Sequence, residues 1–236
     1  MAASLPLIFA TRTPSFDGCV LALVSFLRSK KLSTDGLEES KYIKFQSDMS
    51  PHLHSALNSI LNKEVEASAS KTGAYLSYQR HRIVDRFYHG DTGNIRVTTD
   101  EATGKILCSV IKERIADMHV HFPNSPFDIR ISVSVEKPAL LSEKEVTKRS
   151  PKYERIKNRV SYSLHQQAIP HPTAFLICDL TQVTSNTSEP MTHEFEVELC
   201  DPKNLTHENG AFESIVCAYW TSIRQLAFSL AGPVKF

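Results

Sequence analysis

The segment His193-Glu-Phe-Glu-Val-Glu-Leu199 alternates acidic and apolar residues without a break. Alternation with a period of two is typical of a β-strand. Glu194, Glu196 and Glu198 therefore share one face of the predicted strand. Three carboxylates in a row repel one another unless cations or hydrogen-bond donors balance them. The segment predicts either the solvated outer face of an antiparallel sheet or a wall of hard oxygen ligands for Mg²⁺ or Mn²⁺.

Two further segments alternate in the same way. In Arg155-Ile-Lys-Asn-Arg-Val-Ser-Tyr162 the cations share one face, and in Asp128-Ile-Arg-Ile-Ser-Val-Ser-Val-Glu136 the polar residues do. One side of every strand in a closed barrel faces the lumen, and Arg and Lys bind phosphate oxygens by charge-assisted hydrogen bonds. We therefore predict a barrel whose lumen has acids on one wall and cations on another, a lining suited to a metal-bound polyphosphate. The alternative is that these charged faces meet water.

The composition sets limits on the class of protein. A length of 236 residues is typical of one β-rich domain. The sequence has 27 Lys and Arg residues and 26 Asp and Glu residues, so the protein as a whole has no strong positive field. Recognition of an anionic ligand therefore has to be local. The five cysteines form no CxxC pair, which predicts reduced thiols in an intracellular protein. The apolar run Cys19–Leu27 is too short to span a bilayer, so no membrane association is expected.

Periodicity places the other elements. Ser50-Pro51 predicts the start of a helix that ends near Val65, and apolar spacing of three and four predicts a second helix over Phe212–Leu230 that packs on the barrel. Tyr75, Tyr78 and Trp220 are interpreted as core or interface residues rather than base-stacking platforms. Residues 1–40, with a polar loop at 29–40, are an atypical N-terminal segment before a domain at 41–236. Strands are predicted at residues 75–78, 82–88, 94–98, 106–116, 128–135, 153–162, 174–182 and 192–200, with polar connectors at 66–73 and 137–152.

From about Lys41 to the C-terminus, an ordered set of segments resembles one known family. The segments are Phe45-Gln-Ser-Asp-Met-Ser-Pro51, Arg96-Val-Thr-Thr-Asp100, Lys112-Glu-Arg114, and the three alternating strands described above. They are similar to the metal-dependent RNA 5′-triphosphatases of the fungal mRNA-capping apparatus, within the triphosphate tunnel metalloenzymes. The resemblance implies an eight-stranded antiparallel tunnel with flanking helices, which holds the triphosphate end of RNA while Mn²⁺ or Mg²⁺ assists release of the γ-phosphate.

The resemblance also implies roles for individual residues. Glu136 would organise the attacking water, and Glu198 would ligate the metal with Glu194 and Glu196 close by. The cations and polar residues expected to contact phosphate or line the tunnel are Arg96, Lys112, Arg155, Lys157, Arg159, Asp179 and Thr181. A cage of fixed cations and a metal suits phosphoryl transfer, which depends mostly on positioning and charge stabilisation.

Two departures from the family pattern stand out. The family has a first strand of Glu-x-Glu type, and nothing before Lys41 looks like it, because the adjacent Glu38 and Glu39 would point to opposite faces of a strand. We therefore expect the first strand to be missing or replaced. In Phe175-Leu-Ile-Cys-Asp-Leu-Thr181, Ile177 stands where the family usually has an arginine.

The leading functional hypothesis is a nuclear RNA 5′-triphosphatase of cap formation, or a homologue that handles other polyphosphates, with low metal-dependent turnover. The expected partners are 5′-triphosphate RNA and an mRNA guanylyltransferase, and a homodimer is left open. The first rival is a catalytically impaired scaffold subunit of the same fold. A more distant rival is a β-barrel carrier for a small ligand, for which an apolar lumen would be expected.

Overall fold

The computed structural model describes residues 2–4, 6–9, 45–69, 74–91, 93–120, 127–139, 141, 143–166, 175–187, 190–200 and 212–231. Within these residues the strands are β1 (Ala2–Ser4), β2 (Pro6–Phe9), β3 (Ala74–Gly90), β4 (Gly93–Asp100), β5 (Ile106–Val120), β6 (Ile129–Pro138), β7 (Tyr153–Gln166), β8 (Phe175–Ser185) and β9 (Thr192–Cys200). The helices are α2 (Pro51–Ser68), α3 (Glu143–Lys148) and α4 (Phe212–Ala231).

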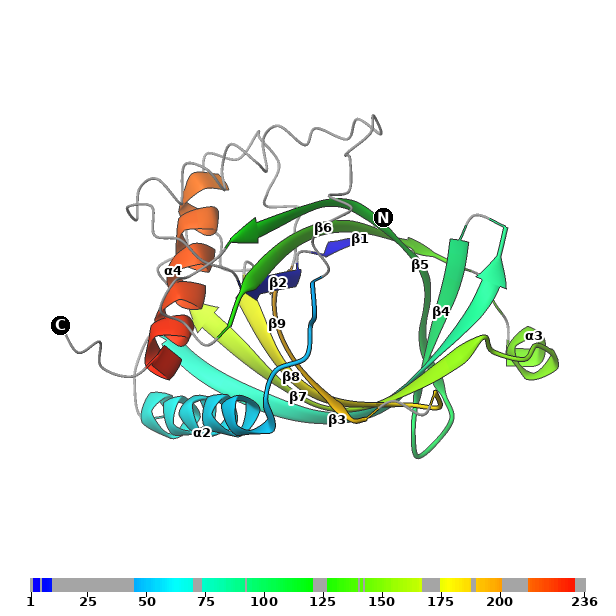
Figure 1. Cartoon of the computed structure of the whole chain (residues 1–236), viewed down its shortest axis with the longest axis horizontal. Helices are drawn as coiled ribbons and strands as arrows, with labels where there is room; N and C mark the ends of the chain where they lie inside the picture. The colour runs from blue at the N-terminus through cyan, green and yellow to red at the C-terminus, as the bar shows by residue number, and fades with distance from the viewer. Residues whose placement is uncertain are drawn as a thin grey trace.

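The described strands form one antiparallel sheet that closes on itself (Figure 1). Its order is β1-β6-β2-β9-β8-β7-β3-β4-β5, and a further pairing of β6 with β5 completes the ring. β1 pairs with β6, and β2 pairs with both β6 and β9, so the two short strands share one position. The nine strands therefore fill eight positions of a barrel.

The expectation that the first strand is missing or replaced has a specific outcome. Residues 2–9 occupy the position between β6 and β9, so the strand is replaced rather than missing and the barrel has no open seam there. The predicted loop at 29–40 and the domain boundary at residue 40 lie outside the described residues.

The apolar faces of the strands point outward, toward the helices. Figure 1 shows α2 and α4 on the side of β7, β8 and β9, and α3 on the opposite side of the barrel. Leu57 and Leu61 of α2 are fully buried in the cluster that joins both long helices to the sheet, and each such side chain contributes roughly 1.5–3 kcal/mol. The Tyr162 hydroxyl on β7 lies 2.7 Å and 2.8 Å from the amide oxygens of Asn58 and Asn62.

Both helices predicted from periodicity are confirmed. Ser50 caps α2 by accepting a hydrogen bond from the Leu53 amide at 3.3 Å, with Pro51 in the first turn, and α2 continues through the predicted connector to Ser68. The apolar stripe of α4 is buried, and Trp220 is a core residue as expected. Tyr78 is not, since it is 53% exposed, and the Tyr75 side chain lies outside the described residues.

The strand boundaries differ from prediction in two places. The predicted strands at 75–78 and 82–88 are one strand, β3, because β7 pairs with it continuously from Ala74 to Phe87. The segment 137–152, expected to be a polar connector, contains the short helix α3. No helix in the described part of the chain is long and apolar enough to cross a membrane.

Candidate functional site

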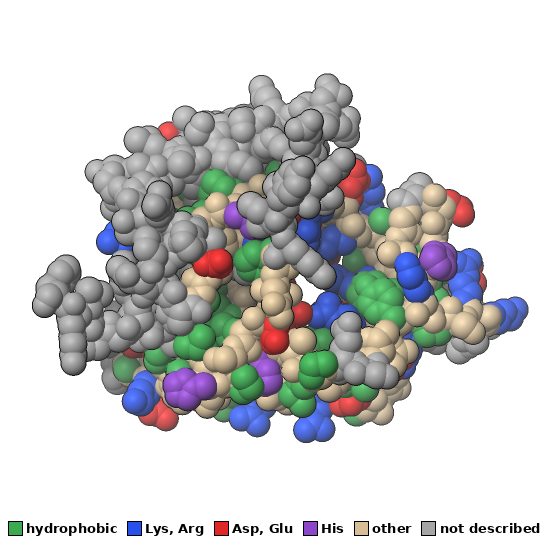
Figure 2. Space-filling view, viewed as in Figure 1, with side chains coloured by type: hydrophobic (Ala, Val, Ile, Leu, Met, Phe, Trp, Pro, Cys, Tyr) green, Lys and Arg blue, Asp and Glu red, His purple; other side chains and the backbone are tan. Residues whose placement is uncertain are grey.

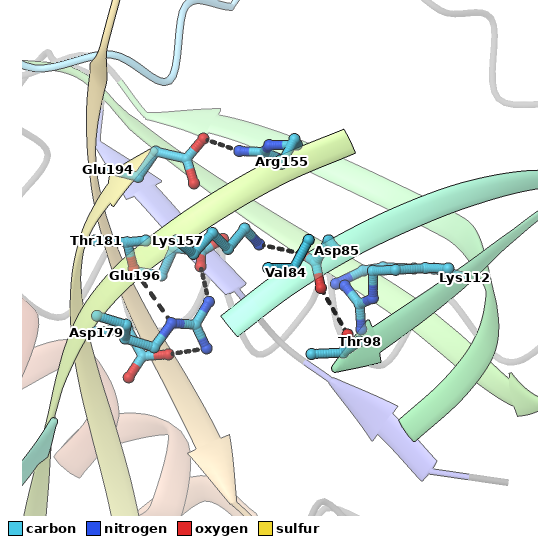
Figure 3. Close-up of polar contacts among 12 residues, drawn as sticks. Val84, Asp85, Thr98, Lys112, Arg155, Lys157, Asp179, Thr181, Glu194 and Glu196 are labelled. Carbon is cyan, nitrogen blue, oxygen red and sulfur yellow. Dashed lines mark hydrogen bonds and ion pairs between the residues drawn. The ribbon is translucent and has the colours of Figure 1, made fainter. Parts of the chain in front are cut away.

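A buried ion pair lies at the centre of the tunnel wall. The Nζ atom of Lys157 on β7 lies 2.7 Å from Oδ2 of Asp85 on β3 (Figure 3). The Thr98 hydroxyl of β4 donates a hydrogen bond of 2.6 Å to Oδ1 of the same carboxylate. Burial would raise the pKa of Asp85, but Lys157 and the hydrogen bond from Thr98 hold it below the usual value. The carboxylate is therefore ionised at neutral pH and fixes the position of the ammonium group.

Arg159 connects three strands on the same face. Its Nη1 atom lies 2.7 Å from Asp179 of β8 and its Nη2 atom lies 3.6 Å from Glu196 of β9. Its Nε donates to the Thr181 hydroxyl at 3.2 Å. Although burial opposes ionisation of Glu196, Lys157 and Arg159 hold the pKa of this carboxyl below the usual value. The basic strand β7 and the acidic strand β9 therefore lie on either side of β8, and Arg159 links their charges along the same inward face.

Two other groups of ions complete the wall. Arg155 Nη2 lies 2.5 Å from Glu194 Oε1, which links the starts of β7 and β9. On the far side, Glu136 of β6 lies between two cations, with Arg96 at 3.1 Å and Lys112 at 3.5 Å. These cations are accessible to a ligand, since the Lys112 side chain is 33% exposed whereas that of Lys157 is 8% exposed.

The described structure thus brings the predicted site residues to one face of the barrel. Figure 2 shows a central hollow in the molecular surface with Lys and Arg side chains around it. Phosphate oxygens accept the same charge-assisted hydrogen bonds as carboxylates, so a polyphosphate can compete for these cations. The predicted residues joined there by the ion pairs and hydrogen bonds above are Arg96, Lys112, Glu136, Arg155, Lys157, Arg159, Asp179, Thr181, Glu194 and Glu196.

Glu198 has different surroundings from the other acids of β9. Its register partners are Ile177 on β8 and Pro6 on β2, neither of which carries a charge. Burial, with the neighbouring carboxylates of Glu196 and Asp179, raises the pKa of Glu198 to about 7. The carboxyl is therefore partly protonated at neutral pH, and a metal ion would have to compete with that proton.

The residues present do not fit a complete Mg²⁺ or Mn²⁺ site. Within the described ranges, no three His, Cys, Asp or Glu side chains are grouped closely enough to hold a metal ion. β2 is the neighbour of β9 at Glu198, and residues 2–9 contain no acidic residue. A hard divalent cation needs about six oxygen ligands, and β2, the strand beside Glu198, can supply no carboxylate.

The sequence interpretation missed Asp85 and Thr98, which hold Lys157 in place. The available signal was a single acid whose neighbours on the same strand face, Ile83 and Phe87, are apolar, in a segment already predicted to be a strand. Such an acid needs a partner if its face is buried, but its partners lie on β4 and β7, and the sequence does not reveal which strands are adjacent.

Comparison with known proteins identifies one family for this chain. The family model described as "mRNA capping enzyme, beta chain" matches residues 31–225. The mRNA-capping enzyme subunit beta of Schizosaccharomyces pombe is 34% identical over 161 residues, covering 66% of this chain and 49% of that protein. The subunit of Cryptococcus neoformans is 34% identical over 192 residues, covering 74% of this chain and 44% of its own length. The matches thus span about half of these relatives or less.

Solved structures show the same fold. The structure of the S. pombe Pct1 RNA triphosphatase superposes with a TM-score of 0.69 at 24% identity, covering 95% of this chain and 83% of that one. Pct1 in complex with the Spt5 CTD gives a TM-score of 0.70 at 24% identity, covering 92% and 94%. The predicted antiparallel tunnel is confirmed. Because the family model matches most of its length, the chain belongs to the mRNA-capping enzyme β-subunit family.

Proposed function

We propose that this chain binds the 5′-triphosphate end of RNA in its tunnel and acts as the RNA 5′-triphosphatase-type subunit of a nuclear capping apparatus. The observation that carries the proposal is the set of cations on one inward face. Arg155, Lys157 and Arg159 alternate along β7 and face acids of β3, β8 and β9, with Arg96 and Lys112 across the tunnel. This arrangement suits a chain of phosphates, whose oxygens accept several hydrogen bonds from fixed donors.

The proposed roles follow from the degree of burial. Arg96, Lys112, Arg155 and Arg159 are partly exposed, so they would contact the phosphates and stabilise charge that develops on the γ-phosphoryl group. Lys157 is held in the tunnel wall by Asp85 and would contribute a fixed positive charge behind the cations that contact the phosphates. Glu136 lies between two cations, and its carboxylate would orient the attacking water. Asp179 and Thr181 would position Arg159.

We propose that metal-dependent turnover is low in this chain as written. In the family reaction a divalent cation supplies charge stabilisation at the transferring phosphoryl group. Here Glu194, Glu196 and Glu198 form one acidic wall and the opposing strand has no acid. The surrounding cations repel a divalent ion, so Mn²⁺ or Mg²⁺ would be held weakly.

A second candidate function is a binding or scaffold subunit with the same ligand and no turnover. The observation that favours it is the apolar sequence Ala-Ala-Ser-Leu-Pro-Leu-Ile-Phe at residues 2–9, in the place of the metal-binding strand. As partners we propose 5′-triphosphate RNA and an mRNA guanylyltransferase, because the relatives are named as subunits of a capping enzyme. A homodimer is a further proposal.

One experiment separates the two candidates. Binding of inorganic tripolyphosphate and of 5′-triphosphate RNA is measured, and phosphate release from RNA and from ATP is followed with and without Mn²⁺. We expect binding of both ligands and slow or undetectable release. Release at rates typical of enzymes, ~1–10³ s⁻¹, would show that other carboxylates complete the metal site. Absence of tripolyphosphate binding would contradict the proposed function itself.

A further inference from the structure

Two aromatic rings are stacked at one end of the tunnel. The rings of Phe87 on β3 and Tyr153 on β7 are nearly parallel, with centroids 4.2 Å apart and an interplanar angle of 10°. The two residues are register partners, and they lie near the end of β3 and at the start of β7. The pair therefore marks the end of the barrel at which β9 also begins, because β7 and β9 are both antiparallel to β8.

The stack lies on the same face as the cations. Phe87 follows Asp85 by two residues and Tyr153 precedes Arg155 by two, and residues two apart share a face of a strand. Burial raises the pKa of Tyr153, and the charges of Arg155, Asp85 and Arg96 all act on its hydroxyl. The ring is thus within electrostatic reach of the ions that line the tunnel.

The stack is not part of either hydrophobic core. Neither ring belongs to the buried cluster beneath α2 and α4 or to the cluster around Tyr88, Ile95 and Val97. Both side chains are partly exposed. A tunnel built for phosphate alone gains nothing from aromatic surface beside its cations, whereas a nucleotide offers both an anionic end and a flat apolar base.

We infer that Phe87 and Tyr153 form a stacking platform for the base of the 5′-terminal nucleotide, while its triphosphate lies among the cations. The inference rests on the proposed function and adds a binding site for the base, which the cations do not provide. Residues two apart on a strand are separated by roughly 6.5–7 Å, so a base on Tyr153 places its phosphates beside Arg155 and Lys157. Since every base has a π face, such stacking tolerates any first nucleotide.

The test uses two ligands that differ by the nucleoside. Tyr153→Leu and Phe87→Leu are compared with the unmodified chain for binding of inorganic tripolyphosphate and of a short 5′-triphosphate RNA. We expect the RNA to bind about 5- to 150-fold more weakly to each variant, from the usual contribution of one base–aromatic stack. Tripolyphosphate should bind with unchanged affinity, and Tyr153→Phe should retain RNA binding because the ring remains.

The control is Tyr78→Leu. Tyr78 also belongs to β3 and also contacts a tyrosine of β7, Tyr162, but it lies on the outer face and is 53% exposed. This variant should leave both ligands unaffected.

The outcomes keep the two proposals apart. Equal losses for tripolyphosphate and RNA would mean that the stack is a cross-strand pair that merely supports the sheet, and would overturn the inference. Unchanged RNA binding would also overturn it. If the unmodified chain fails to bind tripolyphosphate, the proposed function is contradicted and the inference falls with it.

Discussion

Lys157 and Asp85 form an ion pair of 2.7 Å with side chains that are 8% and 3% exposed, between strands that lie side by side in the barrel. Removal of one partner from a buried pair leaves an uncompensated charge. We therefore expect Asp85→Ala to lower the free energy of unfolding by about 3–5 kcal/mol, measured by chemical denaturation.

The matched control for this prediction is Arg86→Ala. Arg86 pairs with Glu154 at 2.7 Å on the same two strands, but these side chains are 32% and 27% exposed. A pair exposed to solvent is worth about 0–1 kcal/mol. Equal destabilisation by Asp85→Ala and Arg86→Ala would refute the importance given to burial.

The second prediction concerns the cations of β7. Arg159→Ala removes a charge-assisted contact of roughly 1.5–3 kcal/mol, so tripolyphosphate should bind about 10- to 150-fold more weakly. Lys157→Ala removes the fixed charge behind that contact and should also weaken binding. Titration calorimetry on variants whose circular dichroism shows them folded would measure this. Lys137→Ala is the control, because Lys137 pairs with Glu113 away from the tunnel cations and is 52% exposed. Unchanged affinity in both β7 variants would count against the site.

The third prediction is a pH dependence. The pKa of Glu198 is raised on folding from 4.5 to about 7, so the folded state binds more protons than the unfolded state between these values. The free energy of unfolding therefore falls as pH rises through this window. Glu198→Gln removes the titrating group and should be more stable than the unmodified chain above pH ~7, by up to ~3 kcal/mol, with little difference below pH ~4.5.

The pH dependence of the free energy of unfolding that Glu196→Gln removes should have the opposite sign. Lys157 and Arg159 outweigh burial and lower the pKa of Glu196 on folding. Its ionised form thus stabilises the fold above the unfolded pKa, and this stabilisation is lost as pH falls through the folded value. Denaturation curves of both variants from above neutral pH to well below 4.5, with a chelator present, provide the measurement. Parallel curves for the two variants would contradict these assignments.

The fourth prediction restores a metal site. Pro6 lies opposite Glu198 and Leu7 opposite Val197, so position 8 lies opposite Glu196. Directly opposite residues have Cβ atoms ~4.5–5.5 Å apart. Pro6→Glu combined with Ile8→Glu should therefore raise Mn²⁺ affinity at least about tenfold, since affinity follows the number of carboxylate ligands.

Two further variants make this test specific. Pro6→Gln with Ile8→Gln introduces side chains of the same shape without charge and should leave Mn²⁺ affinity unchanged. Glu198→Gln added to the glutamate variant should abolish most of the gain. If both designed variants bind Mn²⁺ equally, the register of β2 does not determine the metal site.

The charged lining could be predicted because β7 and β9 carry it with a strict period of two. The strands, and the fact that the predicted cations and acids share one face of each, follow from that alternation. Two residues could not be found in this way. Asp85 and Thr98 acquire their importance from neighbours on other strands, and strand adjacency is not a local property of the sequence.

Residues 2–9 illustrate the same limit more strongly. Their sequence has no alternation, and Pro6 weakens any prediction of a strand. They become strands through backbone pairing with β6 and β9, which are more than 100 residues away in the sequence. The division of β3 into two predicted strands has a similar cause, since the polar run Gln79-Arg80-His81 is kept in the strand by its pairing with β7.

The outward orientation of the apolar residues has a consequence for how this protein can change over generations. The two faces of β7 have different roles. Tyr162 on the outer face bonds to α2, while Arg159 on the inner face lines the tunnel. An exchange of the inward residue leaves the packing between sheet and helices intact. A lineage can therefore alter or abandon the chemistry of the tunnel while the architecture survives, and the apolar strand at residues 2–9 is what such a divergence would look like.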